Sequence, residues 1–503
     1  MSLPKRAFTS GTRRPFKRGF QANVRRPQQY TYHRPWLEGQ ILSRTQANFR
    51  TSVYWWEAAA VWGGLIDFWA YTNDSRYNPT IQQALMAQTG PDYNYMPEEY
   101  FYTLGNDDQT FWAMACLTAL EYDFPVPEGE RSSVYLDLAV NVFNTQVPRW
   151  DTTTCGGGLK WQVFENRNGY HYKNSVSNGG FMQMAARLAR YTGNQTYLDW
   201  AEQSWDWMRG IGLIGANYEV FDGSDDTLNC TELDHTTWSY NPAMLIYSTA
   251  ILYNYTNGSD SEMWQERTTG LLTAAANRFF SPYENATDVM LEPACEPTNN
   301  CNNDQYAFKG LLARWMAKAA VVAPYIAEAV EVLLATSAEA AAESCSGGTD
   351  DVTCGQKWYV GGYDGSYGVG QQLSALETVQ SLLLLHGDVN FTRQYPATED
   401  DVYVRVESSP TTTLRLPPGG EATNAPDSDD NDGGDGNSDD GSGGDSTQGQ
   451  DGRTDSGSSS EDDGEDGDNE EGSGSGASTL HLSMWNLGAL PVLAGLFLFG
   501  IAK

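Results

Sequence analysis

Apolar residues follow a helical period along the middle of the chain. From Val53 to about His386, aromatic and small apolar residues recur every three or four positions, as in the run Trp55, Trp56, Ala59, Trp62, Gly63, Ile66 and Trp69. This spacing places apolar side chains on one face of an α-helix, and the strict alternation typical of a β-strand is rare. The pattern therefore predicts an all-α domain.

The predicted helices come in pairs joined by short turns. Three similar turns, at 71–74, 191–194 and 255–258, each end an aromatic helical segment and precede another one. Segments that change from polar to aromatic residues begin at six places, 53 to 67 residues apart: near Tyr54, Asp107, Asn174, Tyr240, Asp304 and Gly370. Six hairpins of similar length predict an (α/α)6 toroid barrel. An open α-solenoid is the alternative, but solenoid repeats share a recognisable consensus and these do not.

A closed barrel would bring the starts of its inner helices together at one mouth. The polar residues at these starts would then line a single cleft. They are Glu57, Asn106, Gln109, Asn174, Asn178, Asn241, Asp304, Lys309, Asp364, Gln371 and Gln372.

Composition divides the rest of the chain sharply. Residues 1–50 carry eleven Lys or Arg and one acid, whereas 421–471 carry nineteen Asp or Glu and one Arg. The acidic stretch has too few apolar residues to form a core, so 409–478 is expected to be a disordered linker after a domain at 51–408. The overall formal charge of −34 makes nucleic acid a poor partner.

The C-terminal segment 479–503 is different again. Small residues at 474–477 and a short spacer precede an almost wholly apolar run from Trp485 to Ala502. This order is typical of a GPI-attachment signal, and a single membrane-spanning anchor or a buried end are the alternatives. A cell-surface location also calls for an apolar signal peptide, which residues 1–50 lack; we interpret them as disordered or as a misassigned first exon.

Seven cysteines indicate an oxidising compartment. Their spacing suggests three disulfides, Cys155–Cys230, Cys295–Cys301 and Cys345–Cys354, with Cys116 free and buried inside a helix. Zinc is a weak rival, because no CxxC occurs and none of the five histidines stands at a ligand spacing. Seven N-x-S/T sequons support the secretory route.

Asp107 and Asp108 are the best candidate for chemistry. They stand where a polar cluster becomes an aromatic helix, and glycoside hydrolysis uses two carboxyl groups, one as acid and one as nucleophile or base. Adjacent residues could hold their carboxyl groups about 5–7 Å apart, near the separation of roughly 5.5 Å used by retaining enzymes. A plain helix cap is the competing explanation, although Gly105 or Asn106 could cap equally well.

Aromatic residues next to polar ones favour a sugar-binding cleft. Trp56, Trp112 and Tyr240 adjoin acids or amides and could stack on sugar rings, although large helical domains also need aromatic residues in the core.

Several blocks resemble glycoside hydrolase family 76. They are GNDDQTFW (105–112), GGLKWQ (157–162), KNSVSNG (173–179), WSYN (238–241), FKG (308–310), and DG with GQQ (364–372). Within that family the chain is similar to GPI-anchored fungal mannan endo-1,6-α-mannosidases of the Dfg5/Dcw1 type. The match covers about 54–386, and the basic residues 1–50 depart from it.

The resemblance implies a retaining α-1,6-mannosidase with a role in the cell wall. Asp107 is then the expected nucleophile and Asp108 the acid/base. The expected substrate-binding residues are Trp56, Glu57, Asn106, Gln109, Trp112, Asn174, Asn178, Tyr240, Asn241, Lys309, Asp364 and Gln372. Hydrolysis and transfer to an acceptor such as β-glucan both stay open, as does a catalytically silent mannan-binding protein. We expect a monomer without a metal or cofactor.

Overall fold

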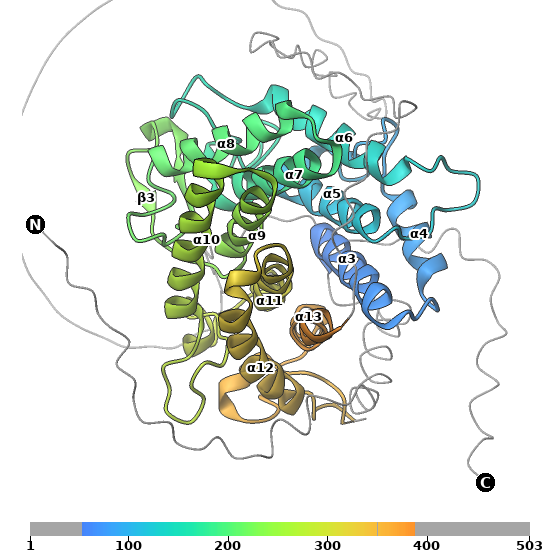
Figure 1. Cartoon of the computed structure of the whole chain (residues 1–503), viewed down its shortest axis with the longest axis vertical. Coiled ribbons are helices and arrows are strands. Elements are labelled where there is room, and N and C mark those ends of the chain that lie inside the picture. Colours follow the sequence, from blue (N-terminus) through green and yellow to red (C-terminus); the bar gives the residue numbers. More distant parts are fainter. Residues whose placement is uncertain (1–52, 350, 388–503) are drawn as a thin grey trace, which may run out of the picture. The chain divides into compact units, whose positions relative to one another are not determined.

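The computed structural model describes residues 53–349 and 351–387 (Figure 1). The predicted basic segment 1–50, the acidic linker 409–478 and the GPI signal 479–503 lie outside the described residues. In the described part, no helix has the length and apolar character needed to cross a membrane.

Six helices form a closed circuit of contacts: α3 (Trp55–Thr72), α5 (Asn106–Glu121), α7 (Ser175–Thr192), α9 (Tyr240–Tyr255), α11 (Gln305–Val322) and α13 (Val369–His386). Each packs against the next, and α13 packs against α3 (Figure 1). All six begin within one residue of a start predicted from the sequence. The predicted all-α class is confirmed.

Five further helices pack outside this circuit: α4 (Asn78–Ala87), α6 (Val134–Gln146), α8 (Gln195–Gly210), α10 (Gly258–Phe279) and α12 (Ala327–Ser344). Short 3-10 turns lie in the connections, at Phe101–Thr103, Val147–Arg149, Asp226–Leu228, Glu296–Thr298, Pro324–Ile326 and Trp358–Val360.

Burial distinguishes the two sets of helices. Outer helix α8 buries one stripe, which includes Leu198, Ala201, Trp205 and Met208, and its other face is polar. Inner helix α5 is enclosed by its neighbours, and every residue of it except Asp107 is buried. Most residues of the inner helices are therefore buried, and exposed ones such as Asn254 and His386 lie in their last turns.

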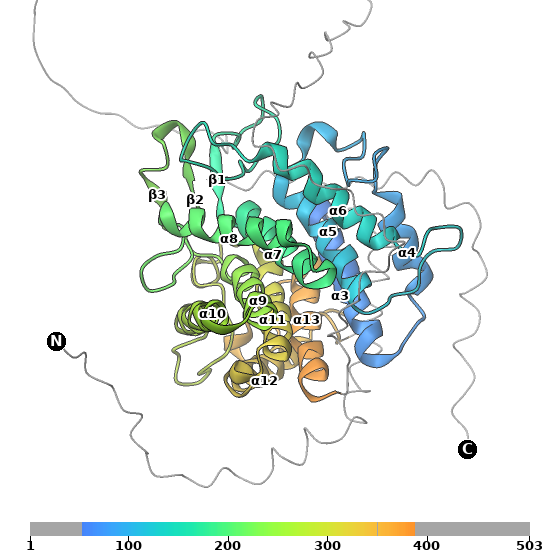
Figure 2. The ribbon, with the colours of Figure 1, turned by 45° about the horizontal axis from the view of Figure 1, so that its top comes forward.

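A small antiparallel sheet lies at the start of α7 (Figure 2). Its strands are β1 (Tyr172–Asn174), β2 (Gly223–Asp225) and β3 (Leu233–Asp234), in the order β1-β2-β3. Asn174 pairs with Gly223, and the backbone N–H of Ser175 donates to the carbonyl of Asp222 at 2.7 Å. The sheet thus ties the start of α7 to the loop that follows α8.

Three disulfides connect loops, at the pairs expected from the sequence. Cys155–Cys230 links two distant loops, whereas Cys295–Cys301 and Cys345–Cys354 close short ones. Cys116 is a free, buried thiol in α5, 3.0 Å from the hydroxyl of Tyr95.

A layer of buried charges connects the inner helices. Arg314 of α11 donates to Asp67 of α3 at 2.6 Å and lies 3.7 Å from Glu377 of α13. Arg187 of α7 donates two hydrogen bonds of 2.8 Å to Glu121 of α5. These paired ions satisfy one another inside the domain, where an unpaired charge would be costly.

Candidate active site

The two aspartates lie at the first turn of α5 in different surroundings. Asp108 is 4% exposed, and its Oδ2 accepts a 2.8 Å hydrogen bond from the backbone N–H of Gly105. Asp107 is partly exposed, and its Oδ2 accepts a 3.1 Å hydrogen bond from the indole N–H of Trp161. Asp108 is therefore enclosed, whereas Asp107 is partly exposed but keeps its Oδ1 buried without a hydrogen-bond partner among the described residues.

Both carboxyl groups gather over Gly105. A Cβ added to this glycine would collide with Oδ1 of Asp107 and would lie 3.2 Å from Oδ2 of Asp108. The missing side chain at position 105 is what allows the two acids to share one side of the helix start.

The segment 160–163 fixes the start of α5. The backbone N–H of Asn106 donates to the carbonyl of Trp161 at 2.9 Å, and its side-chain amide donates to the carbonyl of Lys160 at 2.8 Å. On the other side, the N–H of Val163 donates to the carbonyl of Leu104 at 3.3 Å. Trp161 is thereby held next to Asp107.

A buried lysine organises the loop that leads to Trp161. The ammonium of Lys173 donates to the carbonyls of Asp151, Thr154 and Gly157 at 2.7 to 2.9 Å, and it lies 3.1 Å from the Asp151 carboxylate. The Lys173 side chain is completely buried. The positive charge thus gathers the loop much as a bound cation would.

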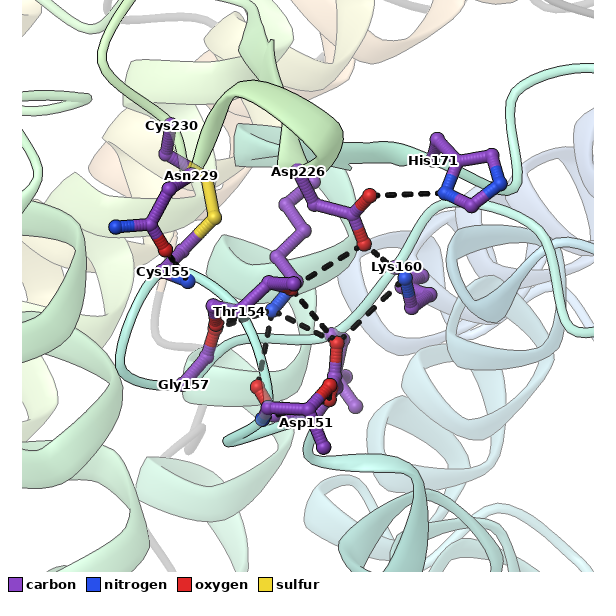
Figure 3. A network of polar contacts seen from close by, with 12 residues as sticks. Asp151, Thr154, Cys155, Gly157, Lys160, His171, Asp226, Asn229 and Cys230 are labelled. Atoms are coloured by element: carbon purple, nitrogen blue, oxygen red, sulfur yellow. Dashed lines mark hydrogen bonds and ion pairs between the residues drawn. A yellow bond between two sulfur atoms is a disulfide. The ribbon is translucent and has the colours of Figure 1, made fainter.

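Figure 3 shows the surroundings of this loop, where Asp226 stands between Lys160 and His171. Nδ1 of His171 lies 2.9 Å from Asp226, and the ammonium of Lys160 also approaches Asp151 at 3.5 Å. The disulfide Cys155–Cys230 joins the same two loops covalently. Ionic and covalent links therefore converge on the segment that supports Asp107.

Aromatic rings from four inner helices, α3, α5, α9 and α11, meet near the acids. Trp56 lies 4.6 Å from Phe111 and 6.3 Å from Phe308, and Tyr240 stacks on Phe308 at 3.8 Å. Trp56 also donates its indole N–H to Asp304 at 2.9 Å. The starts of α3, α9 and α11 are thus brought together by their side chains.

Burial raises the pKa of both acids. Burial raises the pKa of Asp107 to about 7, while hydrogen bonds from its own backbone, from Asp108 and from Trp161 hold it down. Burial and then the charge of Asp107 raise the pKa of Asp108 well above its usual range. The negative charge of Asp304 raises the pKa of both, and of Glu57 as well.

A further carboxyl, that of Asp222, lies near Tyr240. Asp222 accepts a 2.7 Å hydrogen bond from the hydroxyl of Tyr172 and a 3.5 Å one from the amide of Asn241. Burial raises the pKa of Asp222 to about 6. Asp222, Asp107 and Asp304 all raise the pKa of the Tyr240 hydroxyl, so the tyrosine lies within the field of all three.

The model of glycosyl hydrolase family 76 matches residues 26–394. The chain belongs to glycoside hydrolase family 76.

Residues 53–349 and 351–387 contain no group of three or more His, Cys, Asp or Glu placed to hold a metal ion.

Fungal members of family 76 are similar over most of the matched region. The mannan endo-1,6-α-mannosidase DCW1 of Eremothecium gossypii is 43% identical over 71% of this chain and 78% of its own. The DCW1 protein of Saccharomyces cerevisiae has the same identity and coverage. The crystal structure of Dfg5 from Chaetomium thermophilum in complex with glucosamine has a TM-score of 0.65 and 34% identity, covering 72% of this chain and 90% of that one.

Several residues that the family resemblance predicts to contact substrate form hydrogen bonds with other parts of the protein. The side-chain oxygens of Asn106 and Gln109 accept from Arg149 at 2.8 and 2.9 Å. Asn178 bonds both backbone groups of Leu159, and Asn174 caps α7 by accepting from the N–H of Ser177 at 3.2 Å. These amides fix the loops around the acids, and a role in binding sugar stays a prediction.

Four other predicted residues have similar protein partners. Trp112 packs 5.1 Å from Trp55 and 5.2 Å from Tyr95, in the core. Lys309 is completely buried and pairs with Glu296 at 2.8 Å. Two side chains fix the loop before α13. The carboxylate of Asp364 accepts from the backbone N–H groups of Gln356, Lys357 and Ser366. The side-chain oxygen of Gln372 accepts from the backbone N–H of Cys354.

Trp161 and Asp222 were absent from the residues predicted to form the site, and Asp304 had no assigned role. Trp161 stands inside the conspicuous run GGLKWQ, but no local pattern says that its N–H meets Asp107, 54 residues away. Asp304 was placed correctly at a helix start, and its contact with Trp56 spans 248 residues.

We expect Asp304→Asn to move both limbs of the pH profile of kcat/KM to lower pH. The substitution removes a negative charge that raises the pKa of Asp107 and Asp108, and asparagine can still accept the Trp56 hydrogen bond. Limbs at unchanged pH, with activity merely reduced, would show that Asp304 acts only through packing.

Proposed function

We propose that the chain is a retaining, endo-acting α-1,6-mannosidase or transglycosidase. It acts on mannan or on the mannose core of a GPI glycan during biogenesis of the fungal cell wall. The observation that carries this proposal is the Asp107–Asp108 pair, one acid partly exposed and bonded by Trp161 and the other enclosed. The mannan endo-1,6-α-mannosidases that are 43% identical support the choice of bond.

In the first step, the ionised Asp107 attacks the anomeric carbon. Hydrogen bonds from Trp161 and the backbone stabilise its anion, so it loses its proton before Asp108. Asp108 gives its proton to the glycosidic oxygen, the bond from the anomeric carbon to that oxygen breaks, and the leaving sugar departs as an alcohol.

In the second step, the ester between the sugar and Asp107 is broken. Asp108, now a carboxylate, takes a proton from water or from a sugar hydroxyl as that oxygen attacks the anomeric carbon. Asp107 leaves as a carboxylate, and Asp108 is protonated again. Two inversions give net retention, and the identity of the attacking oxygen decides between hydrolysis and transfer.

The partly exposed side chains around the pair suit a sugar ring. Trp56 and Tyr240 are only 5% and 9% exposed and pack on Phe111 and Phe308, and Glu57 and Asn241 are buried as well. Trp161 and Asp222 are partly exposed beside the pair, and they offer an indole ring for C–H groups and a carboxyl for hydroxyls. We assign substrate contact first to Trp161 and Asp222. The amides and charged groups bonded within loops would position them.

The proposal includes the organisation of the whole chain. The closed circuit of inner helices and the helices outside it support an (α/α)6 toroid. The acidic segment 409–478 would act as an extended linker, and 479–503 as the signal for a GPI anchor that holds a monomeric enzyme at the cell surface.

Incubating the purified full chain with an α-1,6-mannan oligosaccharide tests the reaction. Products longer than the substrate indicate transfer, and shorter products alone indicate hydrolysis. A β-glucan oligosaccharide added as acceptor would appear in mixed products if transfer to glucan occurs. Binding without any product would overturn the enzymatic proposal in favour of a catalytically silent mannan-binding protein.

A further inference from the structure

A cavity of about 520 Å³ lies between the outer helices α8 and α10. Its volume is within the range of small-molecule sites in proteins. The walls include Trp205, Arg209 and Gly210 of α8, Tyr218 of the following loop, and Glu266 and Arg267 of α10. None of these residues belongs to the inner helices that carry the Asp107–Asp108 site, so the cavity is separate from it.

Arg267 is held in this cavity without a hydrogen-bond partner. Its guanidinium lies 4.3 Å from the ring centre of Trp264 and 4.8 Å from that of Trp205. The side chain is 18% exposed, and the nearest carboxylate, that of Asp206, is 3.9 Å away. Across residues 53–349 and 351–387, no acceptor is within hydrogen-bond distance of it. Two indoles therefore fix a planar set of donors that a bound molecule could use.

The opposite wall is built around Tyr218. Its backbone φ is 67°, in the left-handed region that few large residues adopt. Its ring occupies the space over Gly270, where any Cβ would collide with it. Its hydroxyl donates to Glu266 at 3.4 Å.

Arg209 holds the loop that carries this tyrosine. It donates to the carbonyls of Ile214, Gly215 and Ala216, and its guanidinium lies 5.1 Å from the centre of the Tyr218 ring. The donors of Arg209 are thus used by the protein, in contrast to those of Arg267. The wall is preformed, because a strained residue is fixed by contacts on several sides.

The charges around the cavity define the ligand. Two guanidinium groups, Arg209 and Arg267, are balanced by two carboxylates, Asp206 and Glu266. An anion would meet both carboxylates, and a cation would meet both guanidinium groups. A neutral vicinal diol can accept from Arg267 and donate to the carboxylates, while its C–H groups contact the apolar side chain of Met263 in the same lining.

We propose that the α8–α10 cavity is a second carbohydrate site, for a neutral hexose oligosaccharide such as an α-1,6-linked mannoside. The choice of mannoside rests on the proposed function, whereas the preference for a neutral sugar rests on the cavity itself. A polymer held at both sites gains an effective concentration near Asp107 that a short substrate does not. The cavity therefore strengthens the binding of long chains.

Binding to an inactive chain tests the site directly. We expect the full chain with Asp107→Asn to bind an α-1,6-mannopentaose at two sites in calorimetry, and the added substitution Arg267→Met to remove one of them. Gly210→Gln is a second probe, because a Cβ at Gly210 meets no atom within 4 Å and the longer side chain can fill the cavity without strain. Arg131→Met is the matched control, since Arg131 is 80% exposed on another part of the surface.

Kinetics give a second readout. In the otherwise unaltered chain, Arg267→Met and Gly210→Gln should each raise KM for long mannan roughly tenfold and leave kcat and the turnover of a short substrate unchanged. Two binding sites in both cavity variants, or a single site in the Asp107→Asn chain, would overturn the proposal. Failure of the proposed function would show instead as no turnover by the unaltered chain, with binding that depends on Arg267 still measurable.

Discussion

Asp107→Ala is expected to abolish turnover of every mannoside, whereas Asp108→Ala should spare substrates with a good leaving group. Loss of a general acid costs about 10²- to 10⁴-fold on a natural glycoside. An aryl mannoside whose phenol leaves as an anion does not need the proton of Asp108, so the first step should survive and release a burst of phenol. Rates with aryl and natural substrates, measured side by side, separate the two roles.

The asparagine variants serve as controls for folding. Asp107→Asn and Asp108→Asn keep the shape of each side chain, and both should bind an oligosaccharide with a thermal midpoint close to that of the parent chain. Activity that survives both changes would mean that the pair is not the catalytic centre. A phenol burst in Asp107→Ala and none in Asp108→Ala would mean that the two roles are exchanged.

Arg314→Met should lower the free energy of unfolding by about 3–5 kcal/mol, the usual cost of breaking a buried ion pair. The substitution keeps most of the apolar volume and removes the partner of Asp67 and Glu377, both buried. Lys318 still donates to Asp67 at 2.7 Å and should limit the loss. Urea denaturation followed by tryptophan fluorescence measures it.

Arg131→Met provides the comparison for this experiment. Arg131 is 80% exposed, and it pairs with Asp137 at 2.7 Å on the surface. Such pairs contribute about 0–1 kcal/mol. Similar small losses in both variants would mean that the buried charge layer does not hold the inner helices together.

The starts of the inner helices could be predicted because one physical rule governs them. Each inner helix is rich in aromatic and small apolar residues and is preceded or opened by a polar stretch, so the change from polar to aromatic residues marks the boundary. In α5 this boundary also carries Asp107, the single unburied residue of the helix. Family motifs then supplied what the pattern could not, namely the bond that is cleaved.

The sequence alone could not predict the hydrogen-bond and ion-pair partners of the polar residues. An amide side chain at a helix start can face the cleft or bond to a neighbouring chain segment. The pattern of polar and apolar residues along the sequence is the same in both cases. Asn178 faces the backbone of Leu159 and Gln109 faces Arg149, although both stand at predicted mouth positions. Long-range pairs such as Arg314 with Asp67, 247 residues apart, depend on how the helices close on each other.

The stereochemistry of the first product tests the central claim most directly. The full chain would be mixed with an α-1,6-mannan oligosaccharide, and the anomeric protons would be followed by NMR before mutarotation. Attack by Asp107 followed by attack of water predicts that the α-anomer appears first and the β-anomer grows in later. The β-anomer appearing first would contradict a covalent intermediate on Asp107, and no cleavage at all would contradict the assignment of Asp107 and Asp108 as a mannosidase centre.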